Sequence, residues 1–470
     1  MNINKNNTIR VRFAPSPTGH LHIGGLRTTL FNWLFARHNK GIFLLRIEDT
    51  DLERSKPEFI YSILDALEWC SIISDEEPLI QSHSIEIHKK LIQKLVDEGK
   101  AYRCYCPPST DIETLDYYRY GSFCRMREQF TTDQPYVIRI KLPTDKTHIE
   151  FNDLIYGPIS FALDQFDDFI IARSDGTPVY NFVVVADDAA MNITHVIRGE
   201  EHLQNTPKQI ILYQALGYQI PQFAHLPLIL GPSGSKLSKR DGATAVVDYK
   251  KNGYLAAALC NYLVRLGWSH GDQEVFAVDE LITHFSLEGV HKKAAIFDHK
   301  KLDWLNGVYL RKTDNQEIIN LIQRDVDHTL CADLAQWEHP QLVGFIGLYK
   351  ERCVTLLELS NKLRSLYFHD QEISADELKT LIKENTVSLL QQISEQVQTI
   401  TEFSPEQIKQ IFKMLSKSHD VPLVELAQPV RLALTATVAS PGVFELMAYL
   451  GKNETLIRLK KFITLIEKGK

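Results

Sequence analysis

The pattern of apolar and polar residues changes its period near the start of the chain. Val11 and Phe13 alternate with charged residues, which predicts a short strand. Prolines and a glycine crowd positions 15–19, so the chain leaves regular structure there in a tight loop. The apolar spacing then becomes helical until Gly41. The segment predicts a strand, a loop and a helix in succession.

Alternating strand and helix patterns continue through the first half of the chain. A capping-box pattern at Ser55–Glu58 opens a helix that runs through Trp69, and Gly217 ends another that begins near 206. Further strands are predicted over 42–47, 179–185, 194–197 and 225–230. This order is typical of an α/β fold with a doubly wound, five-stranded parallel sheet of the nucleotide-binding kind.

Two other stretches depart from that pattern. The segment 78–174 holds a helical stretch and short alternating runs such as 136–141, which predicts an inserted domain that splits the sheet domain. From about 253 the pattern is mostly helical, with a helix ending at Asn306–Gly307 and capping boxes at Ser374 and Ser404. The expected domains are 8–77 with 175–250 for the sheet, 78–174 for the insertion, 251–312 for a helical junction and 313–470 for an all-α C-terminal domain.

Composition narrows the class of protein without indicating its function. The chain has 470 residues, 44% hydrophobic and 24% charged, as expected for a soluble protein of several domains. It has neither a secretory leader pattern nor the ~20 apolar residues of a membrane helix. Seven scattered cysteines argue against a disulfide framework. We therefore expect a cytoplasmic protein without a membrane partner, and the net charge of −7 does not by itself indicate a nucleic acid partner.

Two segments carry candidate chemistry for binding phosphate. A tight loop before a helix N-terminus presents backbone N–H groups to an anion, and His22 can donate to phosphate oxygens while Gly24 allows close approach. Such a strand–loop–helix unit is about as often a plain structural scaffold as it is a phosphate-binding site. The second segment, 235–243, holds three cations among small residues after a predicted strand and turn. In isolation it would be interpreted as a solvated loop.

Together, the segments 22–25 and 235–243 resemble the two signature motifs of class I aminoacyl-tRNA synthetases. Gly25 stands where the first motif has its final histidine, which narrows the resemblance to the glutamyl branch. The stretches 15–19 and 45–51 are similar to the same family, the bacterial-type glutamyl-tRNA synthetases. The resemblance runs nearly from end to end.

The resemblance implies a function and a set of site residues. The expected reaction is activation of L-glutamate with ATP to glutamyl-adenylate and diphosphate, followed by transfer to the 3′ end of tRNA-Glu by a monomer. The expected catalytic residues are His22, Lys236 and Lys239. Those expected to bind ATP are Ser16, Thr18, His22, Gly24, Glu201, Leu237 and Lys239. Those expected to bind glutamate are Arg12, Ala14, Ser16, Glu48, Tyr180, Arg198 and His202. The inserted domain would handle the acceptor end of the tRNA, and the last domain its anticodon.

The chemistry of activation agrees with these residue types. A carboxylate with a pKa near ~4 is already a nucleophile at neutral pH, so no general base is required. The catalyst has to align the reactants and neutralise charge on the leaving diphosphate, for which His22, Lys239 and Mg²⁺ are suited. Glu48 suits the α-ammonium, and two arginines suit the side-chain carboxylate.

A cysteine cluster adds a second candidate site. Cys104, Cys106 and Cys124 resemble three ligands of a structural zinc site, with Tyr120 or a water as the fourth. Some members of the family carry Cys or His two residues beyond the last cysteine, where this chain has Met126. Zinc binding and three unmetallated cysteines both remain open.

Three alternative functions compete with charging of tRNA. A small-molecule adenylyltransferase and a truncated paralogue that modifies a tRNA base both use a similar loop, but neither needs the long helical C-terminal region. A non-catalytic RNA-binding scaffold is disfavoured because His22, Gly24 and Lys239 are all present.

Overall fold

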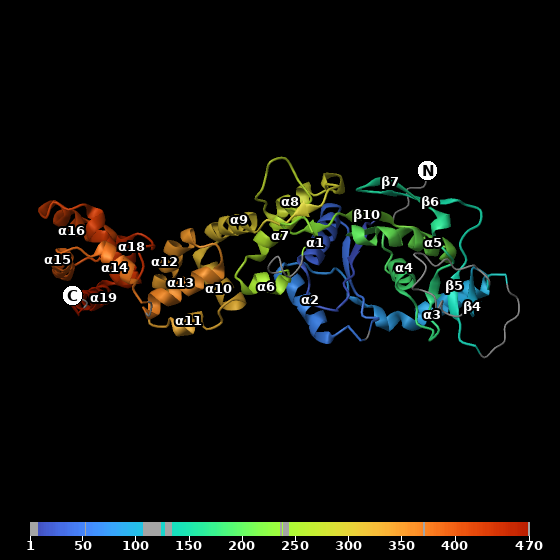
Figure 1. Ribbon diagram of the computed structural model, residues 1–470, viewed down its shortest axis with the longest axis horizontal. Coiled ribbons are helices and arrows are strands. Elements are labelled where there is room, and N and C mark those ends of the chain that lie inside the picture. Colours follow the sequence, from blue (N-terminus) through green and yellow to red (C-terminus); the bar gives the residue numbers. More distant parts are fainter. Residues whose placement is uncertain are drawn as a thin grey trace. The chain divides into compact units, whose positions relative to one another are not determined.

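The computed structural model describes residues 8–51, 53–106, 124–126, 134–235, 237, 244–369 and 372–468. The chain divides into two compact units (Figure 1). The first comprises Met1–Asp248 and Cys260–Asp298, and the second Tyr249–Leu259 and His299–Lys470. No described helix is long and apolar enough to cross a bilayer.

Parallel strands form the centre of the first unit. Strands β1 (Arg10–Phe13), β2 (Ile42–Ile47) and β3 (Leu79–Ile80) pair in that order, and β9 (His195–Gly199) pairs with β10 (Gln222–Leu226). The two groups meet where the Thr194 N–H donates to the Arg10 carbonyl over 2.9 Å. The carboxyl ends of β1, β2 and β9 thus lead toward the same edge of the sheet.

Helices pack beside these strands largely where the pattern placed them. They are α1 (Ile23–His38), α2 (Pro57–Trp69), α4 (Tyr180–Ala190) and α5 (Thr206–Leu216). Helix α5 ends at Gly217, whose φ of 71° is left-handed, as the sequence predicted. The capping box at Ser55 was wrong, because the N-cap of α2 is Lys56 and Pro57 begins the helix.

The strand predicted over 179–185 was also wrong, because these residues enter helix α4. The run Phe182–Val185 is buried on every side, so its side chains show no helical alternation of apolar and polar positions. A short, wholly apolar run of β-branched residues is typical of a buried strand and cannot be told from a buried helix by periodicity. The parallel strands that the pattern missed include β3, the start of β10 and β12 (Ala295–Ile296).

The segment between the two halves of the sheet shares their core. It contains α3 (Ile85–Asp97), an antiparallel sheet of β4 (Ala101–Cys104), β5 (Val137–Ile140) and β8 (Ile170–Ala172), and a hairpin of β6 (His148–Asp153) and β7 (Gly157–Ala162). Strand β6 pairs with β10 in parallel at Asp153 and Phe223. Ile92, Ile149 and Ile171 pack in one cluster with Phe182 and Ile210.

Shorter elements complete the first unit and lead into the second. They are η1 (Gln81–Ser84), η2 (Leu163–Gln165), η3 (Glu200–Asn205), β11 (Ile229–Leu230), α6 (Val246–Lys251), α7 (Ala256–Arg265), α8 (Val278–His284), η5 (Leu287–Gly289) and β12 (Ala295–Ile296).

The second unit is helical throughout its described residues, as predicted for the C-terminal region. Its helices are α9 (His299–Lys312), α10 (Asn315–Asp325), α11 (Leu330–Asp333), α12 (His339–Tyr349), η6 (Lys350–Arg352), α13 (Leu356–Phe368), α14 (Ala375–Leu381), α15 (Thr386–Thr399), α16 (Pro405–Ser418), α17 (Leu423–Thr435), α18 (Val443–Leu450) and α19 (Lys452–Lys468).

Two local predictions in this unit need correction. Helix α9 does not end at Asn306–Gly307 but continues to Lys312. The buried Asn306 side chain accepts from the Leu255 N–H over 2.9 Å and donates to the Val354 carbonyl over 2.6 Å, so it ties segments together. Ser404 caps α16 as predicted, whereas Ser374 takes the N-cap position of α14 without a side-chain cap bond.

Candidate active site

The loop that carries His22 lies against the residues that follow the second predicted motif. His22 forms an antiparallel bridge with Ala245, and the Ile23 N–H donates to the Thr244 carbonyl over 2.9 Å. Two segments far apart in the sequence therefore meet at the start of α1. Leu237 is buried beside β11, whereas Lys236 and Lys239 lie outside the described residues.

His22 is itself the N-cap of α1. The Gly24 N–H donates to its Nδ1 over 3.0 Å, so the neutral ring carries its proton on Nε2. The first turn of this 16-residue helix has no acidic side chain. The positive end of the helix dipole and a histidine N–H donor therefore occur together, which suits an anion such as phosphate.

A cavity of about 170 Å³ opens beside this loop. Its walls include eight of the predicted residues, namely Arg12, Ala14, Gly24, Glu48, Tyr180, Arg198, Glu201 and His202. Ser16, Thr18, His22 and Leu237 are described but do not line it. Gly199 lines it and was missed; a Cβ there would collide with the Glu201 carboxylate.

Buried charges form a network beneath the cavity. Arg12 donates to both oxygens of Asp188, over 2.9 and 3.3 Å. Arg46, which is fully buried, donates to Asp188 over 2.5 Å and to Glu48 over 3.0 Å. Burial would raise the pKa of Asp188, but Arg12 and Arg46 outweigh it and hold the pKa below its ordinary value. Asp188 and Arg46 were not among the predicted site residues.

The burial of the Glu48 carboxylate is less fully offset by neighbouring cations than that of Asp188. Burial raises the pKa of Glu48, and the opposing attraction of Arg46 and Arg12 does not overcome that effect. A carboxylate in this state gains from a cation that enters the cavity.

Arg198 is a buried cation without a carboxylate partner among the described residues. Its Nη2 donates to Thr206 Oγ1 over 2.8 Å and to the His202 carbonyl over 3.3 Å. Its Nη1 has no hydrogen-bond partner in the described part of the chain. Burial lowers the pKa of Arg198 to about 10, and it stays charged at pH 7. Burying an uncompensated cation is costly, so an incoming carboxylate would be stabilised here.

Tyr180 and His202 form a side wall of the same cavity. The Tyr180 hydroxyl lies 3.4 Å from His202 Nδ1, and the two rings are tilted against each other. Burial and the nearby Arg198 lower the pKa of His202 to about 4, so its ring is neutral at pH 7. The wall therefore adds polarity without adding a further charge.

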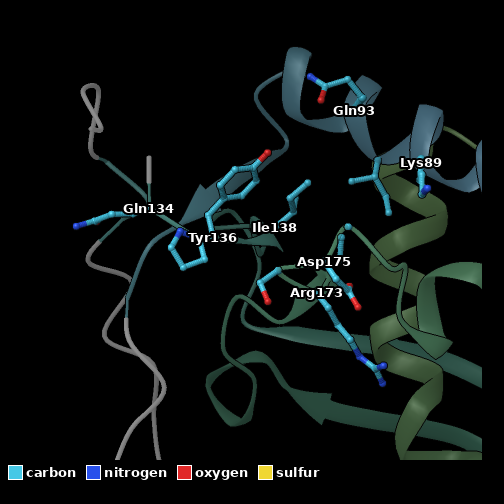
Figure 2. Close-up of a pocket in the computed structure, with 12 residues that line it drawn as sticks. Lys89, Gln93, Gln134, Tyr136, Ile138, Arg173 and Asp175 are labelled. Atoms are coloured by element: carbon cyan, nitrogen blue, oxygen red, sulfur yellow. The ribbon is translucent and has the colours of Figure 1, made fainter. Parts of the chain in front are cut away.

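A second cavity, of about 390 Å³, lies between α3 and the antiparallel sheet. Figure 2 shows Tyr136 and Ile138 on one side and Lys89 and Gln93 on the helix above them. No predicted site residue that the structure describes lines it. It is therefore separate from the candidate active site.

The three cysteines of the predicted metal site come together. The Sγ atoms of Cys104, Cys106 and Cys124 lie within 4.8 Å of one another. Three sulfurs at this spacing suit three corners of a tetrahedral zinc site. Met126 is 87% exposed, and Tyr120 lies outside the described residues.

Comparisons with known proteins show which family the chain resembles over nearly its whole length. Residues 8–304 match the family "tRNA synthetases class I (E and Q), catalytic domain", and residues 321–463 match "Anticodon binding domain". The glutamate–tRNA ligase of Thermodesulfovibrio yellowstonii is 44% identical over 97% of this chain and 99% of its own length. Glutamate–tRNA ligase 1 of Campylobacter hominis is also 44% identical, over 97% and 98%.

Solved structures give the same result. The crystal structure of a glutamate tRNA ligase from Elizabethkingia meningosepticum in complex with its amino acid aligns with a TM-score of 0.87 at 33% identity. The alignment covers 98% of this chain and 100% of the other. The glutamate-tRNA synthetase from Elizabethkingia anophelis aligns with a TM-score of 0.84 at 34% identity, over 97% and 100%. The chain therefore belongs to the class I aminoacyl-tRNA synthetases, in the family of the glutamate–tRNA ligases.

Proposed function

We propose that the chain activates L-glutamate with ATP, releases diphosphate, and transfers the glutamyl group to the 3′ end of tRNA-Glu. The observation that carries this proposal is the pair of buried charges in one small cavity. Within the described part of the chain, Arg198 is a cation without a carboxylate partner, and Glu48 is a carboxylate whose burial is only partly compensated. Glutamate has a side-chain carboxylate at one end and an α-ammonium group at the other. The carboxylate would pair with Arg198, and the ammonium group with Glu48.

The roles of the two arginines differ in this proposal. Arg12 is already paired with Asp188, so it lends positive potential to the cavity while its position is fixed. Arg198 is the group that receives the side-chain carboxylate. Ala14, Tyr180 and His202 shape the cavity around the substrate. Ser16 does not line the cavity, and its assignment to the substrates rests on the family motif in the loop that follows β1.

The ATP site is assigned to the start of α1. Backbone N–H groups of the first helical turn and the Nε2–H of His22 bind phosphate oxygens. Gly24 permits close approach, Thr18 lies in the same loop, and Glu201 and Leu237 border the nucleotide. Lys236 and Lys239 neutralise the leaving diphosphate, and Mg²⁺ accompanies ATP as a counter-ion to its phosphates. These assignments rest on the family motifs and on the contacts of His22 and Ile23 with Ala245 and Thr244, which follow the second motif.

The tRNA is assigned to two regions of the chain. The helical region 321–463 would bind the anticodon, which agrees with its match to anticodon binding domains. The inserted segment 78–174 would bind the acceptor end. We expect a cytoplasmic monomer, with the domain boundaries predicted from the sequence.

A zinc ion is proposed for Cys104, Cys106 and Cys124, with Tyr120 or a water as the fourth ligand. A bound zinc would hold these segments together and has no assigned step in the reaction. Three thiolates with a weak fourth ligand bind zinc less firmly than a complete set, so elemental analysis should find less than one equivalent after dialysis against a chelator. A full equivalent that survives would show that a strong fourth ligand is present.

The test of the main proposal is ATP–diphosphate exchange in the presence of tRNA-Glu. Glutamate should support exchange, and glutamine should be poorer by on the order of 10⁴-fold, because a site made of donors rejects the glutamine NH₂ group. Arg198→Ala should raise the KM for glutamate and narrow the glutamate/glutamine ratio in kcat/KM. Arg12→Ala should narrow the ratio less, because Arg12 is already neutralised by Asp188.

The matched control is Arg37→Ala, which removes an arginine that pairs with Asp75 at the far end of α1. It should leave the ratio unchanged. The absence of exchange with glutamate and tRNA-Glu would favour a non-catalytic scaffold. An unchanged ratio in Arg198→Ala would remove Arg198 from the glutamate site.

A further inference from the structure

Arg198 is held from behind by a buried histidine. Its Nε–H donates to Nε2 of His225 over 3.1 Å, and His225 is completely buried. Thr206 lies 3.1 Å from the same Nε2. The guanidinium therefore has its Nε edge and its Nη2 engaged, which leaves Nη1 as the donor without a partner among the described residues.

The protonation state of His225 is fixed by a second contact. Its Nδ1 lies 2.7 Å from Oδ2 of Asp153, which is 1% exposed. Burial would raise the pKa of Asp153, but the hydrogen bonds from His225 and from backbone N–H groups lower it, so this carboxylate is ionised. An ionised carboxylate only accepts, so Nδ1 carries the proton and Nε2 presents a lone pair to Arg198.

Asp153 is in turn fixed by the backbone around it. Its Oδ1 accepts from the N–H groups of Ile155 and Tyr156, each over 2.9 Å. Asp153 ends β6 and lies beside Phe223 of β10, while His225 of β10 lies beside Arg198 of β9. A hydrogen-bonded chain thus crosses three neighbouring strands, from the inserted segment to the cavity.

We propose that Asp153 and His225 are positioning residues that orient Arg198 toward the side-chain carboxylate of glutamate. The inserted segment 78–174 would then contribute to selection of the amino acid as well as to binding of tRNA. This inference rests on the proposed role of Arg198 as the receptor of that carboxylate. This positioning role requires a neutral His225. A second proton on its Nε2 would point an N–H donor at the Nε–H of Arg198 and place two positive charges side by side.

A second buried pair provides the comparison for a purely structural role. His88 of α3 lies 2.6 Å from Asp187 of α4, and both side chains are buried. This pair also joins the inserted segment 78–174 to the part of the sheet domain at 175–250. The hydrogen bonds that the structure gives His88 do not include one to an arginine, so its loss should affect stability without affecting Arg198.

The experiment measures the KM for glutamate, the KM for ATP and kcat with tRNA-Glu present, together with the Tm. His225→Leu removes the acceptor and should raise the KM for glutamate by roughly 10- to 100-fold, since a hydrogen bond to a charged group is lost. The KM for ATP should change less than about twofold. His225→Gln retains an oxygen that can accept from Arg198 Nε–H and should recover most of the loss. His88→Leu should lower the Tm and leave the KM for glutamate unchanged.

Asp153→Asn is the second variant, for the case in which His225→Leu does not fold. Its amide can donate to His225 Nδ1, which moves the histidine proton onto Nε2 against Arg198, so the KM for glutamate should rise here too. The inference is overturned if His225→Leu and His225→Gln raise the KM for glutamate equally. It is also overturned if Asp153→Asn leaves the KM unchanged while Arg198→Ala raises it. If Arg198→Ala itself has no effect, the proposed glutamate site fails and this inference fails with it.

Discussion

Arg46 connects two carboxylates that the protein could not otherwise bury. It is completely enclosed and bridges Glu48 and Asp188. Arg46→Met leaves both anions with less compensation, and we expect it to lower the free energy of unfolding by about 3–5 kcal/mol. Denaturant titration without ligands measures this effect separately from any effect on substrate binding.

The control for this prediction is Arg54→Met. Arg54 is 74% exposed and pairs with Asp51 on the surface, so its loss should cost at most about 1 kcal/mol. If the two variants were equally stable, the network below the cavity would not hold the folded state together.

At the scale of single residues, the sequence indicated the groups that face the cavity and missed those that hold them. Arg12, Glu48 and Arg198 follow or end strands at the same sheet edge, and family motifs mark their surroundings. Asp188 pairs with Arg12 and Arg46, which lie 176 and 142 residues away in the sequence. A buried ion pair is a relation between two places in the chain, so no local pattern identifies it.

Two glycines share a left-handed backbone conformation but differ in why a larger residue would be destabilising. Gly217 and Gly253 have φ angles of 71° and 78°, but only Gly253 lies against other backbone, where a Cβ would collide with the Leu357 nitrogen. Gly217→Ala should cost about 1 kcal/mol from its left-handed conformation alone. Gly253→Ala adds about 1–3 kcal/mol of overpacking at the start of α13. Thermal unfolding of the two variants makes the comparison, and equal losses would contradict the collision.

Asp327 joins the end of α10 to α13 and predicts how stability depends on pH. It accepts from Arg364 Nε over 2.5 Å and from Ser360 over 2.8 Å. These bonds, the one from Arg364 above all, lower the pKa of Asp327 far below its ordinary value of 3.8. Because the pKa is lower in the folded state, the stabilisation is present above about pH 4 and is lost as the pH falls further.

Asp327→Asn should therefore be less stable than the parent at pH 7, and the difference should shrink toward about pH 2. Urea titrations across this range measure it. Asp376→Asn changes an exposed aspartate of the same unit; it is the control and should cost less stability than Asp327→Asn at pH 7. A difference that stays constant with pH would mean that the carboxylate charge is not what joins the two helices.

At the scale of elements, the prediction succeeded where an amphipathic period or a stop signal was clear. Helix α2 ends at Trp69 as expected, and its buried side chains Ile63, Ala66 and Leu67 follow the helical period. Helix α5 is buried on most sides, and it ends where expected because Gly217 takes the left-handed conformation. Helix α4 was mistaken for a strand because it is enclosed on all sides. Helix α9 continues through Asn306–Gly307 because the buried amide finds backbone partners in other segments, which outweighs the local tendency to stop.

For the whole molecule, we expect tRNA binding that depends strongly on salt despite the net charge of −7. Each contact between a cationic side chain and a phosphate releases counter-ions. If the protein neutralises only a few phosphates, its affinity for tRNA should fall about tenfold or more when salt rises from about 50 to about 200 mM. Filter binding or fluorescence anisotropy with tRNA-Glu across this range measures the slope. A flat response would show that phosphate contacts do not dominate binding.

The division of the chain into two units also limits how their coding sequences can be exchanged between genes by recombination. The polypeptide passes from the first unit to the second at 248–249, returns at 259–260 and leaves again at 298–299. Helix α7 is shared, since Ala258 belongs to the helical core while Cys260–Arg265 belongs to the first unit. Neither unit therefore corresponds to one uninterrupted stretch of the gene. A single recombination event near 298 would transfer a helical domain without Leu255 and Ala258, so lineages that exchange this domain intact need two further joins inside or beside α7.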